Sequence, residues 1–232
     1  MICAAMMAMA FNASAQSEFL HDWIDLGLPS GLLWATHNVG ANKPEEFGYH
    51  FAWGETDSKS EYRRGNYRYF DGDENHITKY CYNPLYGKDG YTDSLTVLES
   101  VDDAATVKWG NGARTPMLDE WYELMENTIG KVDTLNGVSG YRFTATNGNS
   151  IFLPAAGAYM GGQFEGWEDY NSDWSKELDN ANKWGYYWAS TLNTYSPKGI
   201  IGFFFSSTGC YVQGYAGGRY MGYSVRPVRS AQ

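Results

Sequence analysis

Glycine breaks this chain at short intervals, and that spacing limits how long any helix or strand can be. The 232 residues include 27 Gly and only 7 Pro. Glycine supplies the positive φ angles of tight turns and weakens the interior of a helix. Between the glycines the chain is rich in aromatic side chains, with 11 Phe, 9 Trp and 19 Tyr. We therefore expect a globular domain of short strands and tight turns around an aromatic core.

The charge balance excludes one class of partner. Lys and Arg total 17 while Asp and Glu total 27, so the formal net charge is −10 at pH 7. A nucleic acid or an anionic membrane would need a basic surface on the protein. We expect no nucleic-acid partner. We also expect no membrane span, because no segment reaches the ~20 consecutive apolar residues that a spanning helix requires.

The N-terminus has the pattern of a signal peptide. Residues 1–11 are almost wholly apolar, and Ala13-Ser14-Ala15 follows as a cleavage site of small residues. The usual basic n-region is missing, because the first Lys or Arg is Lys43; the leader at 1–15 is therefore truncated or its start lies upstream. An N-terminal strand or buried helix is the alternative interpretation. The pattern predicts a secreted or cell-surface protein with a single domain over 16–232.

Two cysteines remain once such a leader is removed, Cys81 and Cys210. An oxidising compartment would allow them to form one disulfide. Their wide separation in sequence says nothing about their distance in space, so two buried free thiols are an equal alternative.

Short strands are expected near both ends of the chain. Apolar segments bounded by Gly, Ser or Asn predict strands at 23–26, 32–37, 49–53, 141–146, 150–153, 186–189, 200–206, 211–213 and 223–228. Asn147-Gly148 has the residue types of a tight hairpin turn. Residues 59–91 are polar and lack periodicity, which indicates an irregular insertion, and 169–183 is interpreted as an acidic loop.

Two central helices are expected between these strands. Ser100 is the expected cap of the first, because the acidic residues after it would lie where the helix dipole favours them, and Gly110 ends that helix. The second begins after Pro116 and ends at Gly130. Its apolar stripe consists of Leu118, Trp121, Leu124, Met125 and Thr128. This order predicts an α+β domain whose N- and C-terminal strands lie in one sheet.

Motifs of known catalytic chemistry are absent from the sequence. It contains no nucleophile elbow, zinc-protease helix, Cys-x-x-Cys pair, phosphate-binding loop or dinucleotide fingerprint. The 4 histidines are scattered and the carboxylates fall in expected loops, so no acid–base pair can be assigned. We therefore expect a protein that is not an enzyme.

Residues 71–75 are a candidate for Ca²⁺, and the acidic stretch at 165–179 is equally ambiguous. Their sequence, Asp-Gly-Asp-Glu-Asn, places oxygen ligands at alternate positions, which suits this ion. An EF-hand loop would need Gly at its sixth position and Glu at its twelfth, where this chain has His76 and Tyr82. A solvated acidic turn is the favoured interpretation, and neither a metal nor another cofactor is predicted.

The aromatic C-terminal third is the candidate recognition surface. In a strand at 200–206, Phe203 and Phe205 face one way and Phe204 the other, and we expect the first two to lie in the core with Trp188. Surfaces of Tyr, Asn, Ser and Gly give a large contact area at a low cost in side-chain entropy. The predicted ligand-binding residues are Asn193, Tyr195, Lys198, Phe204, Tyr211, Gln213, Tyr215, Arg219 and Tyr220. The alternative interpretation is that these aromatic residues fill the core.

Six segments, in order along the chain, carry a resemblance to a known family. They are WIDLGLPSGLLWATHNVGA (23–41), FGYHFAWGET (47–56), DDAATVKWG (102–110), NGNSIFLPAAG (147–157), GYYWAST (185–191) and GYSVRPV (222–228). Together they resemble the Fibrobacter succinogenes major paralogous domain family, found in exported proteins of gut Bacteroidetes. That family is similar in turn to the C-type-lectin-like fold of formylglycine-generating enzymes and of the variable proteins of diversity-generating retroelements.

The resemblance implies a C-type-lectin-like domain in which 191–220 form the displayed surface. In the variable proteins this surface is diversified between copies of the gene. The scaffold that holds it would be Trp188, Ser190, Arg226 and Val228. His37 stands where the family often has Cys, and Asn127-Thr128 falls where a second Cys is common, so a disulfide between those places is absent. The Glu-Pro-Asn and Trp-Asn-Asp motifs of Ca²⁺-dependent lectins do not occur, so the fold alone does not imply lectin activity.

Three functions follow as hypotheses. The favoured one is an exported, non-catalytic module that binds a glycan or a protein ligand at the cell surface through its C-terminal loops. The first alternative is a structural or tip component of a cell-surface assembly. The second is an enzyme of the sulfatase-modifying type, which uses a cysteine pair. Cys81 and Cys210 lie outside the six segments, so the resemblance gives this last activity no support.

Overall fold

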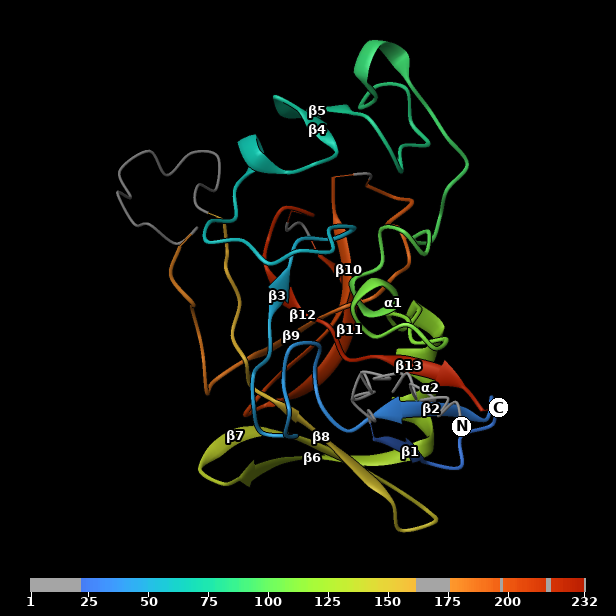
Figure 1. The fold of residues 1–232 in the computed structure, drawn as a ribbon, viewed down its shortest axis with the longest axis vertical. Helices are drawn as coiled ribbons and strands as arrows, with labels where there is room; N and C mark the ends of the chain where they lie inside the picture. The colour runs from blue at the N-terminus through green and yellow to red at the C-terminus, as the bar shows by residue number, and fades with distance from the viewer. Residues whose placement is uncertain (1–21, 162–175, 197, 216–217, 232) are drawn as a thin grey trace, which may run out of the picture.

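The two ends of the chain meet in one three-stranded sheet (Figure 1). β2 (Leu32–Ala35) pairs antiparallel with β1 (Trp23–Asp25) on one side and with β13 (Val228–Ser230) on the other. Trp34 of β2 lies opposite Ile24 in one pair and opposite Val228 in the other, and its side chain is fully buried. The expectation that the N- and C-terminal strands share a sheet is confirmed.

This computed structural model describes residues 22–161, 176–196, 198–215 and 218–231. They form an α+β domain with many short strands and little helix, as expected. The expected leader at 1–15 and residues 169–175 of the expected acidic loop at 169–183 lie outside the described residues. Within the described ranges, no helix has the length and apolar character needed to cross a membrane.

A five-stranded sheet forms the centre of the domain, with the strand order β11-β10-β9-β12-β3. Its strands are β3 (His50–Phe51), β9 (Gly185–Trp188), β10 (Ile200–Ser206), β11 (Gly209–Tyr215) and β12 (Tyr223–Ser224). Side chains alternate between the two faces of β10, so Phe203 and Phe205 belong to one hydrophobic cluster and Phe204 to the other. Trp188 is also buried. The predicted alternation, and the core positions of Phe203, Phe205 and Trp188, are confirmed.

A second antiparallel sheet and the longer helix cover one face of the central sheet. The sheet has the order β6-β7-β8, with β6 (Thr128–Leu135), β7 (Val138–Ala145) and β8 (Ser150–Pro154). On helix α2 (Leu118–Asn127), the indole of Trp121 stacks on the ring of Phe203, with centroids 4.7 Å apart and planes 9° apart. Aromatic stacking therefore joins the helix to the central sheet.

Both helices are found, but their bounds differ from the expected ones. α1 (Ala104–Trp109) starts after Asp103 rather than after Ser100, because the Asp103 carboxylate accepts a hydrogen bond from the Ala105 amide at 2.9 Å. Thr115 donates two further hydrogen bonds to the same carboxylate, which fixes the cap. The end of this helix at Gly110 is as expected.

The second helix stops earlier than the apolar stripe suggests. α2 ends at Asn127, and Thr128 and Gly130 already belong to β6, which pairs with β7 along its full length. Thr128 closes the helix because its hydroxyl donates to the Leu124 carbonyl at 2.6 Å. The sequence did not predict β6.

The segment 59–91 is ordered and contributes to the core. It contains a 3-10 turn (Arg64–Asn66), the hairpin of β4 (Phe70–Asp71) and β5 (Asp73–Ile77), and a second 3-10 turn (Lys88–Gly90). Tyr62, Tyr67 and Tyr80 in this segment are almost fully buried. Figure 1 shows β4 and β5 at one extreme of the domain, far from the sheet that holds the chain ends. The sequence predicted no elements here, because the buried aromatic residues follow neither the helical nor the strand period.

Candidate functional site

The loop between β9 and β10 presents a fully exposed aromatic side chain on a fixed backbone. Tyr195 at its tip is 99% exposed. The side chain of Asn193 is buried beneath it, and its Oδ1 accepts hydrogen bonds from the amides of Tyr195 at 3.0 Å and Ser196 at 3.1 Å. Asn193 Nδ2 also donates to the Ile200 carbonyl at 3.4 Å. Asn193 therefore holds the backbone at Tyr195 and Ser196 while the Tyr195 side chain projects into solvent.

Lys198 joins this loop to the 59–91 segment. Its Nζ lies 3.2 Å from Oε1 of Glu74 and 4.9 Å from the centre of the Tyr86 ring. Glu74 also pairs with Nε of Arg64 at 3.1 Å. Figure 1 shows the same arrangement, with β4 and β5 beside the end of β10 where this loop enters. One surface is thus built from two segments that are far apart in sequence, and we call Tyr195, Lys198, Glu74, Arg64 and Tyr86 the loop surface.

Four of the predicted contact residues are buried, which corrects their assignment to an exposed surface. They are Asn193, Phe204, Arg219 and Tyr220, each less than 10% exposed. Asn193 shapes the loop from below, as described above. Phe204 lies on the face of β10 that packs against Trp188 and Tyr223.

Arg219 and Tyr220 are covered by the 59–91 segment. Nη2 of Arg219 donates to the Tyr80 carbonyl at 3.0 Å, and its guanidinium lies 5.1 Å from the Trp53 ring. The guanidinium of Arg64 lies 5.6 Å from the Tyr220 ring. These two side chains therefore support the loop surface from within and do not form part of it.

The remaining predicted residues lie on β11, at the edge of the central sheet. Tyr211 is 40% exposed and stacks on Phe204 with ring centroids 5.7 Å apart. The backbones of Gln213 and Tyr215 pair with Gly202 and Ile200. The side chains of Gln213 and Tyr215 lie outside the described residues. Among the predicted residues whose side chains the structure describes, only Tyr195, Lys198 and Tyr211 therefore reach the surface.

The carboxylates of the candidate Ca²⁺ segment are engaged by basic side chains. Asp71 pairs with Nζ of Lys88 at 2.5 Å, which lowers the pKa of that carboxyl. Asp73 contacts His76 Nδ1 at 3.0 Å, and Glu74 belongs to the loop surface. In the part of the chain that the structure describes, no three or more His, Cys, Asp or Glu side chains gather in a way that could hold a metal ion.

The thiols of Cys81 and Cys210 do not form an activated pair. Both are free: Cys81 is buried in one hydrophobic cluster, and Cys210 packs against the other. Burial raises the pKa of both thiols above the ordinary value, which disfavours the reactive thiolate. Of the two alternatives that the sequence left open, the structure has two free thiols.

Sequence reasoning missed Arg64, Glu74 and Tyr86 as parts of the site. The available signal was charge: Glu74 sits in an acidic run on a short hairpin, and the C-terminal loop carries one Lys. Opposite charges on two predicted loops indicate a pair only when the fold brings the loops together, and the sequence pattern did not show that.

Comparison with family models, with curated proteins and with solved structures gives no match for this chain.

Proposed function

We propose that this protein is an exported, non-catalytic binding module whose ligand contacts the loop surface. The observation that carries the proposal is Tyr195, a tyrosine with 99% of its surface in solvent on a backbone that Asn193 holds in place. Tyrosine supplies a large, rigid contact area with few rotatable bonds. A fixed loop lowers the entropy cost of binding, because less of the chain has to be ordered when the ligand arrives.

A protein ligand suits this surface better than a small molecule. Tyr195 projects from the domain, and a side chain that is 99% exposed lines no cavity. Tyr and Arg are the residue types that dominate binding energies at protein interfaces, whereas small ligands prefer concave sites. Lys198, three residues after Tyr195 in the loop, and its ion-pair partner Glu74 would add the polar rim that such interfaces have.

We also propose that the fold is C-type-lectin-like and that the family resemblance of the six segments is genuine. Two features of the α+β domain support this: both chain ends lie in one sheet, and two helices lie between the N-terminal and C-terminal strands. The expected scaffold residues Trp188, Ser190, Arg226 and Val228 are all buried. Export is proposed from the apolar N-terminal segment and its cleavage site.

The sulfatase-modifying alternative receives no support from the thiols. That chemistry needs a cysteine pair, and here each thiol packs with a different hydrophobic cluster. The raised pKa of both groups also keeps them protonated at neutral pH.

The experiment that tests the proposal compares two exposed tyrosines. Wild type, Tyr195→Ala and Tyr122→Ala are screened against an array of extracellular and cell-surface proteins. Tyr122 is the matched control, because it is 41% exposed on α2, outside the loop surface. We expect at least one ligand whose affinity falls about tenfold or more in Tyr195→Ala and stays unchanged in Tyr122→Ala.

Two outcomes would contradict the proposal. One is an array on which wild type binds nothing, and the other is binding that both variants retain equally. If the protein is instead recovered within an intact envelope complex, and Tyr195→Ala does not change that recovery, the assembly-component alternative is favoured.

A further inference from the structure

A cleft lies at the far end of β10 from the loop surface. The loop surface precedes Ile200 at the start of this strand, and the cleft includes Ser206 at its end, so the two sites lie on the order of 20 Å apart along the strand. The volume of the cleft is about 390 Å³, which falls in the range of small-molecule sites, about 300–1,000 Å³. It is lined by Val132, Ser139, Gly140, Ala155, Asn182, Lys183, Trp184, Phe205, Ser206, Ser207 and Thr208.

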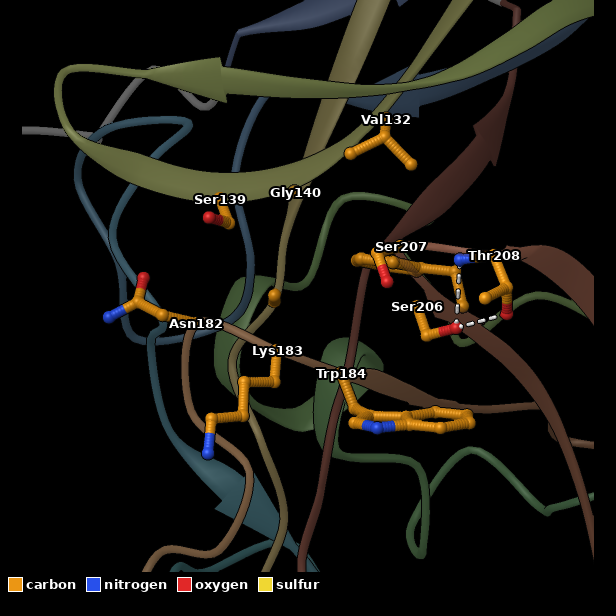
Figure 2. Close-up of a pocket in the computed structure, with 11 residues that line it drawn as sticks. Val132, Ser139, Gly140, Asn182, Lys183, Trp184, Ser206, Ser207 and Thr208 are labelled. Atoms are coloured by element: carbon orange, nitrogen blue, oxygen red, sulfur yellow. Dashed lines mark hydrogen bonds between the residues drawn. The ribbon is translucent and has the colours of Figure 1, made fainter.

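One wall of the cleft is the indole of Trp184. Figure 2 shows this ring on one side of the cleft, with Val132 of β6 across from it. The ring is partly exposed and stacks on Tyr186, with centroids 6.1 Å apart and planes 25° apart. Its backbone is held on both sides, because the Trp184 amide donates to the Asn180 carbonyl and its carbonyl accepts from Gly157. The cleft therefore contains a large aromatic face in a fixed position.

Hydroxyl groups lie beside this aromatic face. Oγ of the buried Ser206 accepts a hydrogen bond from the Thr208 amide at 3.2 Å and shares another with the Thr208 hydroxyl at 2.9 Å (Figure 2). These contacts fix the turn between β10 and β11. The rim adds the hydroxyls of Ser139 and Ser207 and the amide of Asn182. Hydroxyls and amides both donate and accept hydrogen bonds, which matches a ligand that carries many hydroxyls of its own.

The lining of this cleft carries little charge. The described lining contains no carboxylate, and its one charged side chain is Lys183. In Figure 2 the Lys183 chain extends away from the hydroxyls of Ser206 and Thr208. The protein as a whole carries a net charge of −10, which repels anions. The cleft thus presents mainly neutral polar groups around an aromatic ring.

We infer that this cleft binds a neutral carbohydrate, with one sugar ring lying against the indole of Trp184. The C–H groups on the face of a pyranose ring carry a slight positive charge and are attracted to the electron-rich face of an indole. The hydroxyls of the same sugar would exchange hydrogen bonds with Ser206, Thr208 and Asn182. This site is separate from the loop surface and does not depend on the proposed protein ligand.

The test uses a panel of defined oligosaccharides as probes. Neutral oligomers of glucose, xylose, mannose, galactose and N-acetylglucosamine are titrated into the protein in a calorimeter, and oligogalacturonate serves as the acidic counterpart. The variants are Trp184→Ala, Trp184→Phe, Thr208→Val and Tyr195→Ala. Circular dichroism and thermal unfolding show whether each variant is folded.

At least one neutral oligomer is expected to bind wild type. Its affinity is expected to fall about tenfold or more in Trp184→Ala and only a few-fold in Trp184→Phe, which keeps a flat aromatic ring. Thr208→Val removes a hydroxyl at nearly constant shape and is expected to weaken binding a few-fold. Tyr195→Ala is expected to bind as wild type does, which separates this site from the loop surface.

Three results would overturn the inference. The first is that no neutral oligomer binds at millimolar concentration. The second is that oligogalacturonate binds and the neutral oligomers do not. The third is that a folded Trp184→Ala variant binds with wild-type affinity. If Trp184→Ala does not fold, Thr208→Val and Trp184→Phe carry the test, and wild-type affinity in both would overturn it.

Discussion

Nε of Arg226 donates a hydrogen bond to Oδ1 of Asn38 at 2.9 Å, deep inside the domain. The same guanidinium donates to the carbonyls of Ala35 and Thr36, at 3.1 and 3.0 Å, and to that of Phe152 at 3.0 Å. One arginine near the C-terminus therefore ties together the end of β2 and strand β8. Burial lowers the pKa of Arg226 to about 10, so the group stays charged at neutral pH.

Replacing Arg226 should destabilise the domain severely. Arg226→Met leaves buried carbonyl oxygens without donors, at about 1–3 kcal/mol each, so the free energy of unfolding should fall by at least about 3 kcal/mol. The matched control is Arg63→Met, because the Arg63 side chain is 56% exposed, and it should change stability by no more than about 0.5 kcal/mol. Urea unfolding of the two variants measures the difference, and equal stabilities would contradict the assigned role.

Adjacent positions on α2 should respond very differently to alanine. Trp121 is fully buried between Trp34 and Phe203, whereas Tyr122 is 41% exposed. Trp121→Ala should cost about 3–5 kcal/mol, because it leaves a cavity in the core. Tyr122→Ala should cost less than about 1 kcal/mol and controls for the change in helix propensity. Chemical denaturation tests this, and similar losses for both would mean that the helix packs otherwise.

Stability should fall as the pH drops from about 6.5 towards 4. His50 is buried, and burial lowers its pKa from 6.5 to about 4. In this window the unfolded chain takes up a proton at His50 and the folded chain does not, so acid favours unfolding. Full stability is present above pH 6.5, and His50 should account for a loss of about 3 kcal/mol by pH 4.

A His50→Gln variant isolates this contribution. Burial also lowers the pKa of His37, so His37 contributes a loss of stability in acid to both proteins alike. The free energy of unfolding should therefore depend less steeply on pH in the variant than in wild type. Parallel curves for the two proteins would show that His50 titrates normally in the folded state.

Both cysteines should remain reduced after folding in an oxidising buffer. A chain that starts at Asp22 carries two cysteines, and Cys81 and Cys210 lie in different hydrophobic clusters. A thiol assay in denaturant, without reductant, should therefore find two reactive thiols per chain. In the folded protein Cys81, which is 0% exposed, should react more slowly than the partly exposed Cys210. A count of zero in denaturant would indicate a disulfide.

Local patterns predicted the central sheet well. The alternation of Phe203, Phe204 and Phe205 placed each ring on its observed face, because a strand buried on both sides still has a period of two. The stripe that contains Trp121 and Leu124 likewise identified the buried face of α2. The sequence is sufficient to predict a buried side chain where the period of its own strand or helix determines which face it occupies.

The local sequence signal for strand β6 lies in the turn that follows it. Asn136 and Gly137 join β6 to β7 with φ of 50° and 83°, the conformation for which an Asn-Gly pair is preferred in tight hairpins. The same pair at 147–148 also predicts a hairpin, but there Gly148 alone has a positive φ, at 86°. The helical stripe running into Thr128 concealed the change of period at the end of α2.

The candidate site could be predicted only in part, because its composition depends on a contact between distant segments. Tyr195 is exposed and Lys198 is partly exposed, as a Tyr-rich loop suggests. Arg219 and Tyr220 have the same residue chemistry, yet the 59–91 segment covers them. A segment without periodicity gives no sign of which neighbour it will cover, and so the buried and exposed members of the set could not be separated.

The shared sheet of β1, β2 and β13 determines how the domain can be attached to a carrier. Trp23 begins β1 opposite Ala35 and Ser230 ends β13 opposite Leu32, so linkers would join the same sheet at opposite ends of β2. In Figure 1 that sheet is remote from β4 and β5. A carrier fused at one end or at both would therefore be attached at this sheet, remote from the hairpin that contributes Glu74 to the loop surface.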